Sequence, residues 1–267
     1  MKKKSLLIVI LAAVVVALAG AWFWYNYIRA TDDSLANVKK RGVLVVGSDI
    51  PFGVMEFFNA DNKPAGIDVE IAEAIASRLG VELEFRDEEW SQLFSKVKDG
   101  SIDLAISSIT INPERQEEML FSTPYFDGGQ VIVVRTENQE IKGINNLADK
   151  RIAVQTDTTS YSEAKKYTNE SMISAYQSFG SANGGANIAD DLKDGKFDAI
   201  IVDYIQALDM IKYNLGLKIV GVPFTKESYG IATKIGNISL MQEVDSILQE
   251  MVNDGTLEQI ETKWTRF

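Results

Sequence analysis

The stretch Ile102-Asp-Leu-Ala-Ile-Ser-Ser-Ile-Thr-Ile-Asn-Pro-Glu-Arg115 decides the fold of this chain. It opens with an apolar run, which predicts a buried strand over residues 102–106. Hydroxyl residues follow, and Asn112-Pro113-Glu114 then supplies an N-cap, a proline at the first helical position and an acid in the first turn. The stretch therefore predicts a strand, a polar loop and the start of a helix.

The same arrangement predicts a binding site for a small carboxylate. Ser107, Ser108 and Thr110 follow the strand, and Arg115 lies in the first helical turn. The N–H groups at a helix start and a guanidinium both favour a carboxylate, and α/β sheets bind ligands at the ends of their strands. For each residue taken alone, a helix cap beside a surface arginine is the simpler alternative.

Composition excludes several classes of protein. The chain has 267 residues, 46% of them hydrophobic, which is room for one large or two medium domains. It contains no cysteine and no histidine, so a thiolate metal site, a cysteine nucleophile and a Ser-His-Asp triad are excluded. The formal net charge of −11 argues against a nucleic-acid partner. We expect no metal site and no cofactor.

Residues 1–30 have the composition of a membrane-directed segment. Lys2-Lys3-Lys4 precede an apolar run that ends in the cluster Trp22-Phe23-Trp24-Tyr25. Ala17-Leu18-Ala19 fits a cleavage site, so a signal peptide stays open. The length of the run and the aromatic cluster favour an uncleaved anchor, with all that follows Arg29 outside the cytoplasm.

The remaining sequence alternates strand and helix patterns, which predicts an α/β protein. The helix after Gly66 is predicted to have Asp68 as its N-cap, and residues 180–187 are predicted to form a flexible loop. Strands are expected over residues 43–46, 81–85, 131–134, 150–154, 197–202 and 218–222. Helices are expected over residues 67–79, 90–98, 188–193, 204–213, 239–253 and 257–264.

Two segments repeat one pattern. Lys98-Asp-Gly-Ser-Ile-Asp-Leu-Ala-Ile-Ser-Ser108 and Lys193-Asp-Gly-Lys-Phe-Asp-Ala-Ile-Ile-Val-Asp203 both give a helix end, an Asp-Gly turn, an apolar strand and a polar residue at the strand end. The repeat suggests two similar lobes that present strand ends to a shared cleft. A zwitterion would then fit, with its carboxylate on Arg115 and its ammonium on Asp203. Chance recurrence of a common α/β turn is the alternative.

Four motifs together resemble the polar amino-acid solute-binding proteins of ABC importers. They are Gly66-Ile-Asp-Val-Glu-Ile-Ala-Glu-Ala-Ile-Ala-Ser-Arg-Leu79, residues 107–115, Phe121-Ser-Thr-Pro-Tyr-Phe126 and Asp198-Ala-Ile-Ile-Val-Asp203. The resemblance covers about residues 35–267 and implies a two-lobed, periplasmic-binding-protein-like α/β fold with two hinge strands. Residues 35–128 with 224–267 would form one lobe and residues 129–223 the other, after the N-terminal membrane segment of residues 1–30.

The resemblance implies a role for each of eleven ligand-binding residues. One group would hold the ligand's carboxylate and ammonium: Arg115 and Asp203, with Ser107, Ser108, Thr110, Thr158 and Thr159 around them. The other would contact its side chain: Phe52 and Trp90 as aromatic walls, and Asp49 and Gln155 at the polar end. Core packing for the two aromatic residues and a turn cap for Asp49 are the alternatives. Asp157 replaces a glycine usual in the family, and aspartate tolerates the positive φ this turn needs.

The resemblance further implies a monomeric, extracytoplasmic receptor that is not an enzyme. It would close over a polar amino acid and deliver it to the permease of an ABC transporter. Asp49 and Asp157 favour a basic or amide ligand side chain. Two alternatives on the same fold stay open: an enzyme similar to cyclohexadienyl dehydratase, and a ligand-binding sensor domain.

Overall fold

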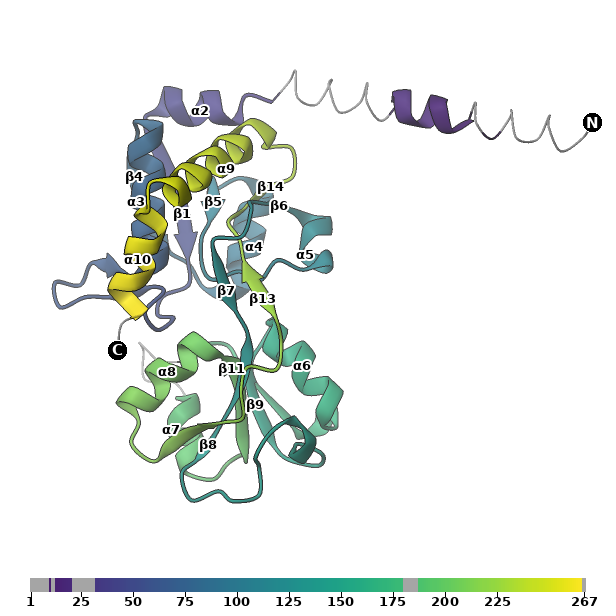
Figure 1. Ribbon diagram of the computed structural model, residues 1–267, viewed down its shortest axis with the longest axis vertical. Helices are drawn as coiled ribbons and strands as arrows, with labels where there is room; N and C mark the ends of the chain where they lie inside the picture. The colour runs from purple at the N-terminus through teal and green to yellow at the C-terminus, as the bar shows by residue number, and fades with distance from the viewer. Residues whose placement is uncertain (1–9, 11–12, 21–31, 180–186, 266–267) are drawn as a thin grey trace, which may run out of the picture.

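The chain forms two α/β lobes that are stacked along the long axis of the molecule (Figure 1). The structure is a computed structural model, and it describes residues 10, 13–20, 32–179 and 187–265. Each lobe is built on one five-stranded sheet with helices on both faces. The predicted α/β class and the two-lobed architecture are confirmed.

The first sheet has the strand order β4-β1-β5-β14-β6. β4 and β5 run parallel to β1, whereas β14 runs antiparallel to both β5 and β6. The bounds of its strands are β1 (Val43–Ser48), β4 (Glu82–Asp87), β5 (Leu104–Ala105), β6 (Met119–Phe121) and β14 (Ala232–Lys234). Its helices are α2 (Ser34–Arg41), α3 (Ile67–Leu79), α4 (Trp90–Asp99), α5 (Pro113–Glu118), α9 (Ile238–Asn253) and α10 (Thr256–Thr265).

Side chains that alternate along β1 serve the two faces of this sheet. Leu44 and Val46 pack in the core formed with α3, α9 and α10, whereas Val45 packs in the core on the α4 side. All three are buried, which explains why the strand reads as a continuous apolar run. A small hairpin of β2 (Phe57–Phe58) and β3 (Pro64–Ala65) extends from this lobe.

The second sheet repeats the plan with the order β10-β9-β11-β8-β12. Val131 and Val133 of β8 pack with α7 and α8, and Ile132 and Val134 pack on the α6 side. Its strands are β8 (Gln130–Arg135), β9 (Ile152–Gln155), β10 (Ile173–Tyr176), β11 (Ala199–Asp203) and β12 (Leu217–Val220). Its helices are α6 (Thr159–Tyr167), α7 (Ile188–Lys193), α8 (Tyr204–Tyr213) and the single turns η1 (Ile144–Asn146) and η2 (Glu170–Met172).

Two antiparallel strands, β7 (Phe126–Gly128) and β13 (Glu227–Tyr229), join the lobes (Figure 1). The chain leaves the first sheet through β7 into β8 and returns from β12 through β13 into β14. These are the two predicted hinge strands. The limits expected for the lobes, residues 35–128 with 224–267 and residues 129–223, stay predictions.

Two predicted segments fall mainly outside the described residues. Of the expected membrane segment, residues 1–9, 11–12 and 21–30 are not described, and residues 13–20 are helical. In the part of the chain that is described, no helix combines the length and the apolar character needed to cross a membrane. Residues 180–186 of the predicted loop also lie outside the described residues.

The central stretch follows the prediction, except that its strand is shorter. Strand β5 covers only Leu104–Ala105, because Ser108 soon turns the chain with a left-handed φ of 48°. Helix α5 begins as expected, with Pro113 at its first position and the Asn112 side chain accepting a hydrogen bond from the Arg115 N–H at 2.8 Å.

The prediction that Asp68 is the N-cap of α3 is wrong. The N-cap is Gly66, and the carbonyls of Val54 and Met55 accept the N–H groups of Ile67 and Asp68 at 3.1 and 2.9 Å. A neighbouring loop therefore caps the helix with its backbone. The Asp68 carboxylate is released for another contact, at the candidate site described below.

Substituting Gly66 with alanine tests this backbone cap. A Cβ at Gly66 would lie 2.3 Å from the Met55 carbonyl oxygen, and φ is +128°. We expect Gly66→Ala to lower the free energy of unfolding by at least about 2 kcal/mol, as measured by urea unfolding. The control is Gly143→Ala, because a Cβ at Gly143 meets no atom within 4 Å. Equal stability of the two variants would contradict the close approach.

Candidate functional site

One cavity between the lobes is lined by all eleven residues predicted from the sequence. Its volume is about 410 Å³ when the space that opens to solvent is included, and Ser160 and Phe179 complete its lining. The residues come from the ends of β1, β5, β9 and β11 and from the starts of α4, α5 and α6. The structure therefore brings the predicted set together, while the contact of each residue with a ligand stays a prediction.

Arg115 is held against the wall of the cavity by its own lobe. Its guanidinium carbon lies 5.3 Å from the ring centroid of Trp90 and 5.1 Å from that of Phe94, and Nη1 donates to the Thr110 carbonyl at 3.0 Å. Burial lowers the pKa of Arg115, and the charges of Glu227 and Asp203 oppose this. Arginine stays protonated in proteins, so the cavity contains a fixed, poorly hydrated positive charge.

Asp203 supplies a negative charge from the other lobe, at the end of β11. Its carboxylate accepts a hydrogen bond from the Tyr229 hydroxyl. Burial, reinforced by the charge of Glu227, raises the pKa of Asp203 to about 6, and the neighbouring Tyr229, Gln130 and Arg115 act against the rise. Asp203 and Arg115 thus present opposite charges to the cavity from the two lobes.

A buried acid pair supports the Ser107–Ser108 turn. The Asp68 carboxylate accepts from the Ser108 N–H at 2.7 Å, and Glu56 accepts from the Ser107 hydroxyl at 3.0 Å. Asp68 and Glu56 are each 0% exposed. Burial raises the pKa of Asp68 to about 6 and that of Glu56 well above its usual value, and the neighbouring charge of Asp68 adds to the rise at Glu56. Like charges this close favour a shared proton.

Three contacts close the cavity between the lobes. The Trp90 Nε1–H donates to the Asp157 carbonyl at 3.1 Å, Gln155 Nε2 donates to Asp49 Oδ2 at 3.3 Å, and the rings of Phe52 and Phe179 lie 6.3 Å apart. Burial raises the pKa of Asp49 to about 6. Asp157 has a φ of 57°, so aspartate does occupy the positive-φ turn as predicted.

Helix α6 points its N-terminus at the cavity. Thr158 is the N-cap, and its hydroxyl donates to the Gln155 carbonyl at 2.7 Å and accepts from the Tyr161 N–H at 3.3 Å. The Thr158 hydroxyl proton is therefore engaged in the turn. What α6 offers a carboxylate is the set of N–H groups that its first turn leaves without an intrahelical acceptor.

Glu227 is the residue that sequence reasoning missed. It lies in hinge strand β13, is 9% exposed, and accepts hydrogen bonds from the hydroxyls of Thr110, Thr159 and Thr225 at 2.6, 3.0 and 3.0 Å. The sequence around it, Thr225-Lys-Glu-Ser-Tyr229, reads as an ordinary polar connection. Only its contacts with Thr159 and Thr110, which lie 68 and 117 positions away, bring it to the site.

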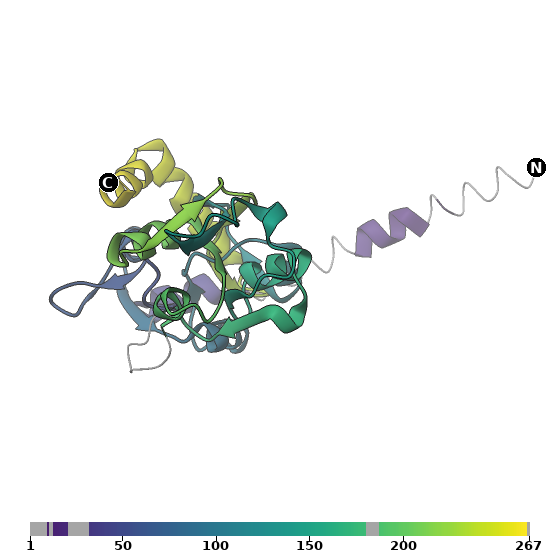
Figure 2. The same cartoon turned by 90° about the horizontal axis from the view of Figure 1, so that it is seen from below.

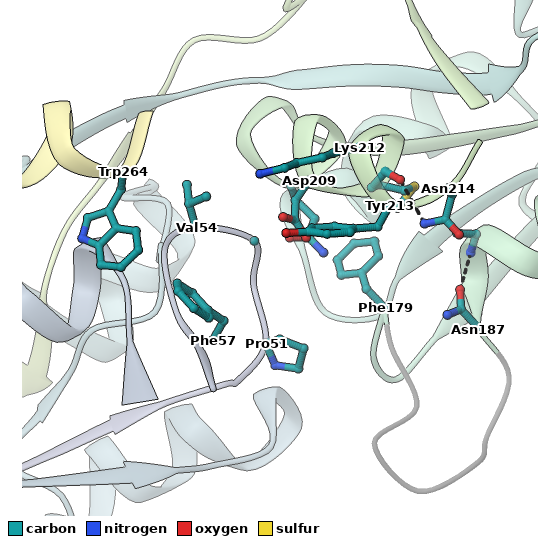
Figure 3. A pocket seen from close by; sticks show the side chains of 14 residues that line it. Pro51, Val54, Phe57, Phe179, Asn187, Asp209, Lys212, Tyr213, Asn214 and Trp264 are labelled. Atoms are coloured by element: carbon teal, nitrogen blue, oxygen red, sulfur yellow. Dashed lines mark hydrogen bonds between the residues drawn. The ribbon is translucent and has the colours of Figure 1, made fainter. Parts of the chain in front are cut away.

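A larger pocket of about 1200 Å³ shares only Phe179 with this cavity. Figure 3 shows Phe57 and Trp264 on one wall and Tyr213, Asp209 and Phe179 on the other, and Figures 1 and 2 place α10 and α8 on the same side of the molecule. None of the predicted residues lines it. The ammonium of Lys212 lies on the same wall as the Asp209 carboxylate (Figure 3), so the charges do not single out one kind of ligand.

Among the described residues, no group of three or more His, Cys, Asp or Glu side chains could hold a metal ion. The donors of the cavity are hydroxyls, amides, carboxylates and one guanidinium. Such a set can hold a small zwitterion by ion pairs and hydrogen bonds.

Comparison with known proteins agrees with this geometry. Residues 44–267 match the family model of the bacterial extracellular solute-binding proteins, family 3. The L-cystine-binding protein TcyJ of Escherichia coli (strain K12) is 32% identical over 87% of this chain and 86% of its own length. The ABC transporter glutamine-binding protein GlnH of Bacillus subtilis (strain 168) is 30% identical over 88% of this chain and 85% of its own.

A solved structure has the same fold. An ancestral arginine-binding protein bound to glutamine is 36% identical, with a TM-score of 0.78 over 84% of this chain and 98% of its own. These three proteins are named for binding amino acids and not for catalysis, which decides against the enzyme alternative. This chain is a non-enzymatic, amino-acid-binding protein of the ABC-transporter type that works outside the cytoplasm, and it belongs to family 3 of the bacterial extracellular solute-binding proteins.

Proposed function

We propose that this chain binds one polar amino acid with a basic or amide side chain in the cavity between its lobes. The lobes close over the ligand, and the closed form delivers it to the permease of an ABC transporter. The chain works as a monomer, held at the outer face of the membrane through its N-terminal segment. A signal peptide that is removed is the alternative for that segment.

The observation that carries the proposal is the opposed pair Arg115 and Asp203, which line one cavity from different lobes. Arg115 would take the ligand carboxylate, and Asp203 the ammonium. Because both groups are largely removed from water, each gains more from a partner charge than it would on the surface. A free amino acid supplies both charges, fixed a short distance apart.

The charge balance of the site favours a basic or amide side chain over an acidic one. Asp49 and Asp203 line the cavity together with Arg115, which is the one cation of its described lining. Glu227 adds a third carboxylate, since it is hydrogen-bonded to Thr110 in the cavity wall. The charges of Asp87 and Glu89 also act on Asp49. A guanidinium, ammonium or amide near Asp49 would offset this excess of negative charge. The relatives named for arginine and glutamine support this choice.

Removing the guanidinium tests the proposal. We expect Arg115→Ala to abolish detectable binding of an amino acid, because losing one partner of a buried charge pair costs about 2–5 kcal/mol. The measurement is isothermal titration calorimetry. Arg86→Ala is the matched control, since Arg86 pairs with Glu84 outside the cavity. Unchanged affinity in Arg115→Ala would contradict the assignment.

The pH dependence of affinity separates a basic ligand from a neutral one. Burial places the pKa of both Asp49 and Asp203 at about 6, so below pH 6 each carboxyl is protonated and must lose its proton before pairing with a cation. L-arginine uses both carboxylates, whereas L-glutamine needs only Asp203. From pH 7 to pH 5, affinity for arginine should therefore fall more steeply than affinity for glutamine. The additional loss for arginine is up to about tenfold over one pH unit below 6, because one more carboxyl must lose its proton.

The variant Asp49→Asn provides the control for this pH prediction. It removes the titrating group near the side chain and should give arginine the shallower pH dependence of glutamine. Titration calorimetry between pH 5 and pH 8 measures both. Equal slopes for arginine in the wild type and in Asp49→Asn would show that Asp49 does not pair with the ligand side chain.

A further inference from the structure

Glu227 is a carboxylate whose contacts are neutral hydroxyls. Its Oε2 accepts from Thr110 Oγ1 at 2.6 Å and from Thr159 Oγ1 at 3.0 Å, and its Oε1 accepts from Thr225 Oγ1 at 3.0 Å. Thr110 belongs to the first lobe and Thr159 to the second, so one oxygen atom in the hinge connects hydroxyls of both. Arg115 and Asp203 act on Glu227 only through their charges.

Backbone pairing fixes this arrangement. The loop after β5 is bonded to the hinge strand: the Ile111 N–H donates to the Ser228 carbonyl at 2.9 Å and the Gly230 N–H to the Ile109 carbonyl at 3.0 Å. Thr110 and Tyr229 form an antiparallel bridge. This backbone pairing holds the main chain of Glu227 close to Thr110.

The direction of these hydrogen bonds decides what the threonines can offer a ligand. An ionised carboxylate only accepts, so the hydroxyls of Thr110 and Thr159 must donate to Glu227. Thr159 Oγ1 in turn accepts from Gln130 Nε2 at 3.3 Å. Thr110, which lines the cavity, then has only lone pairs left for the ligand. It can accept from an ammonium and cannot donate to a carboxylate.

We propose that Glu227 is a specificity-determining residue that makes the site require a free α-ammonium group. Glu227 accepts the hydrogen bond of the Thr110 hydroxyl, so the Thr110 oxygen can only accept a hydrogen bond from a ligand. The negative charge of Glu227 also adds to that of Asp203. Ligands that lack the α-ammonium place nothing against this acceptor and are rejected. The inference rests on the proposed amino-acid binding and adds that Glu227, through Thr110, selects the ligand's amino group.

The test compares each amino acid with its analogue that lacks the α-ammonium. L-arginine is paired with guanidinovalerate, and L-glutamine with glutaramate, and calorimetry gives the affinity ratio within each pair. The variant Glu227→Gln keeps the shape, removes the charge and lets an amide donate to Thr110, so the threonine can turn its proton to the cavity. We expect Glu227→Gln to reduce the affinity ratio by about tenfold or more, the size of a lost hydrogen bond to a charged group.

Two further variants isolate the mechanism. Thr110→Val removes the acceptor and should lower the affinity ratio as much as Glu227→Gln does. The double variant Thr110→Val with Glu227→Gln should lower the affinity ratio little further than either single variant. Glu114→Gln removes a charge that also acts on Arg115 but belongs to an exposed side chain, and it should leave the ratio unchanged.

The outcomes separate this inference from the proposed function. A wild-type ratio that persists in a folded Glu227→Gln variant overturns the role of Glu227 and leaves the proposed function in place. A ratio that falls equally in Glu114→Gln also overturns it, because general charge would then explain the effect. A wild-type protein that binds neither arginine nor glutamine, nor any other amino acid, overturns the proposed function and the inference together.

Discussion

The half-buried guanidinium of Arg115 is the group on which the rest of the site depends. It is stacked near Trp90 and Phe94 and bonded to the Thr110 carbonyl, so its own lobe fixes its position. A charge removed from water must be balanced nearby. Asp203 in the second sheet and Glu227 in the hinge supply the balancing negative charge. Their two negative charges exceed the single positive charge of Arg115. This charge balance supports the proposed ligand, which carries a carboxylate and at least one positive charge.

In the proposed function, each lobe holds a different part of such a ligand. The first lobe contributes Arg115 and the Ser107–Ser108 turn, whose shape depends on Glu56 and Asp68 in the core beneath it. The second contributes Asp203 and the N-terminus of α6. In the proposed function, each half would recognise only part of a zwitterion. An amino acid would then gain its full set of contacts only when the lobes close, which would link binding to the conformation that a transporter recognises.

Much of the site could be predicted because strand ends are visible in a sequence. Ser108 and Asp203 each follow an apolar run at the same point of a repeated pattern, and the Asn-Pro-Glu start of α5 locates Arg115. Asp68 was misassigned because a cap from a distant backbone loop leaves no local signal. Glu227 was missed because it lies 117 positions from Thr110 and only the hinge brings them together. For Trp90, core packing and a place in the wall of the site were alternatives, and the structure shows both, since Trp90 packs in a core and lines the cavity.

The most direct test of the account is thermal unfolding of the protein against each of the twenty amino acids in turn. A ligand that binds only the folded form stabilises it by RT ln(1 + [L]/Kd), about 2.7 kcal/mol at a hundredfold excess over Kd. The account predicts an increase in Tm confined to basic or amide amino acids, such as arginine, lysine or glutamine. An increase with glutamate or aspartate alone would contradict the charge argument, and no increase with any amino acid would contradict amino-acid binding in the cavity.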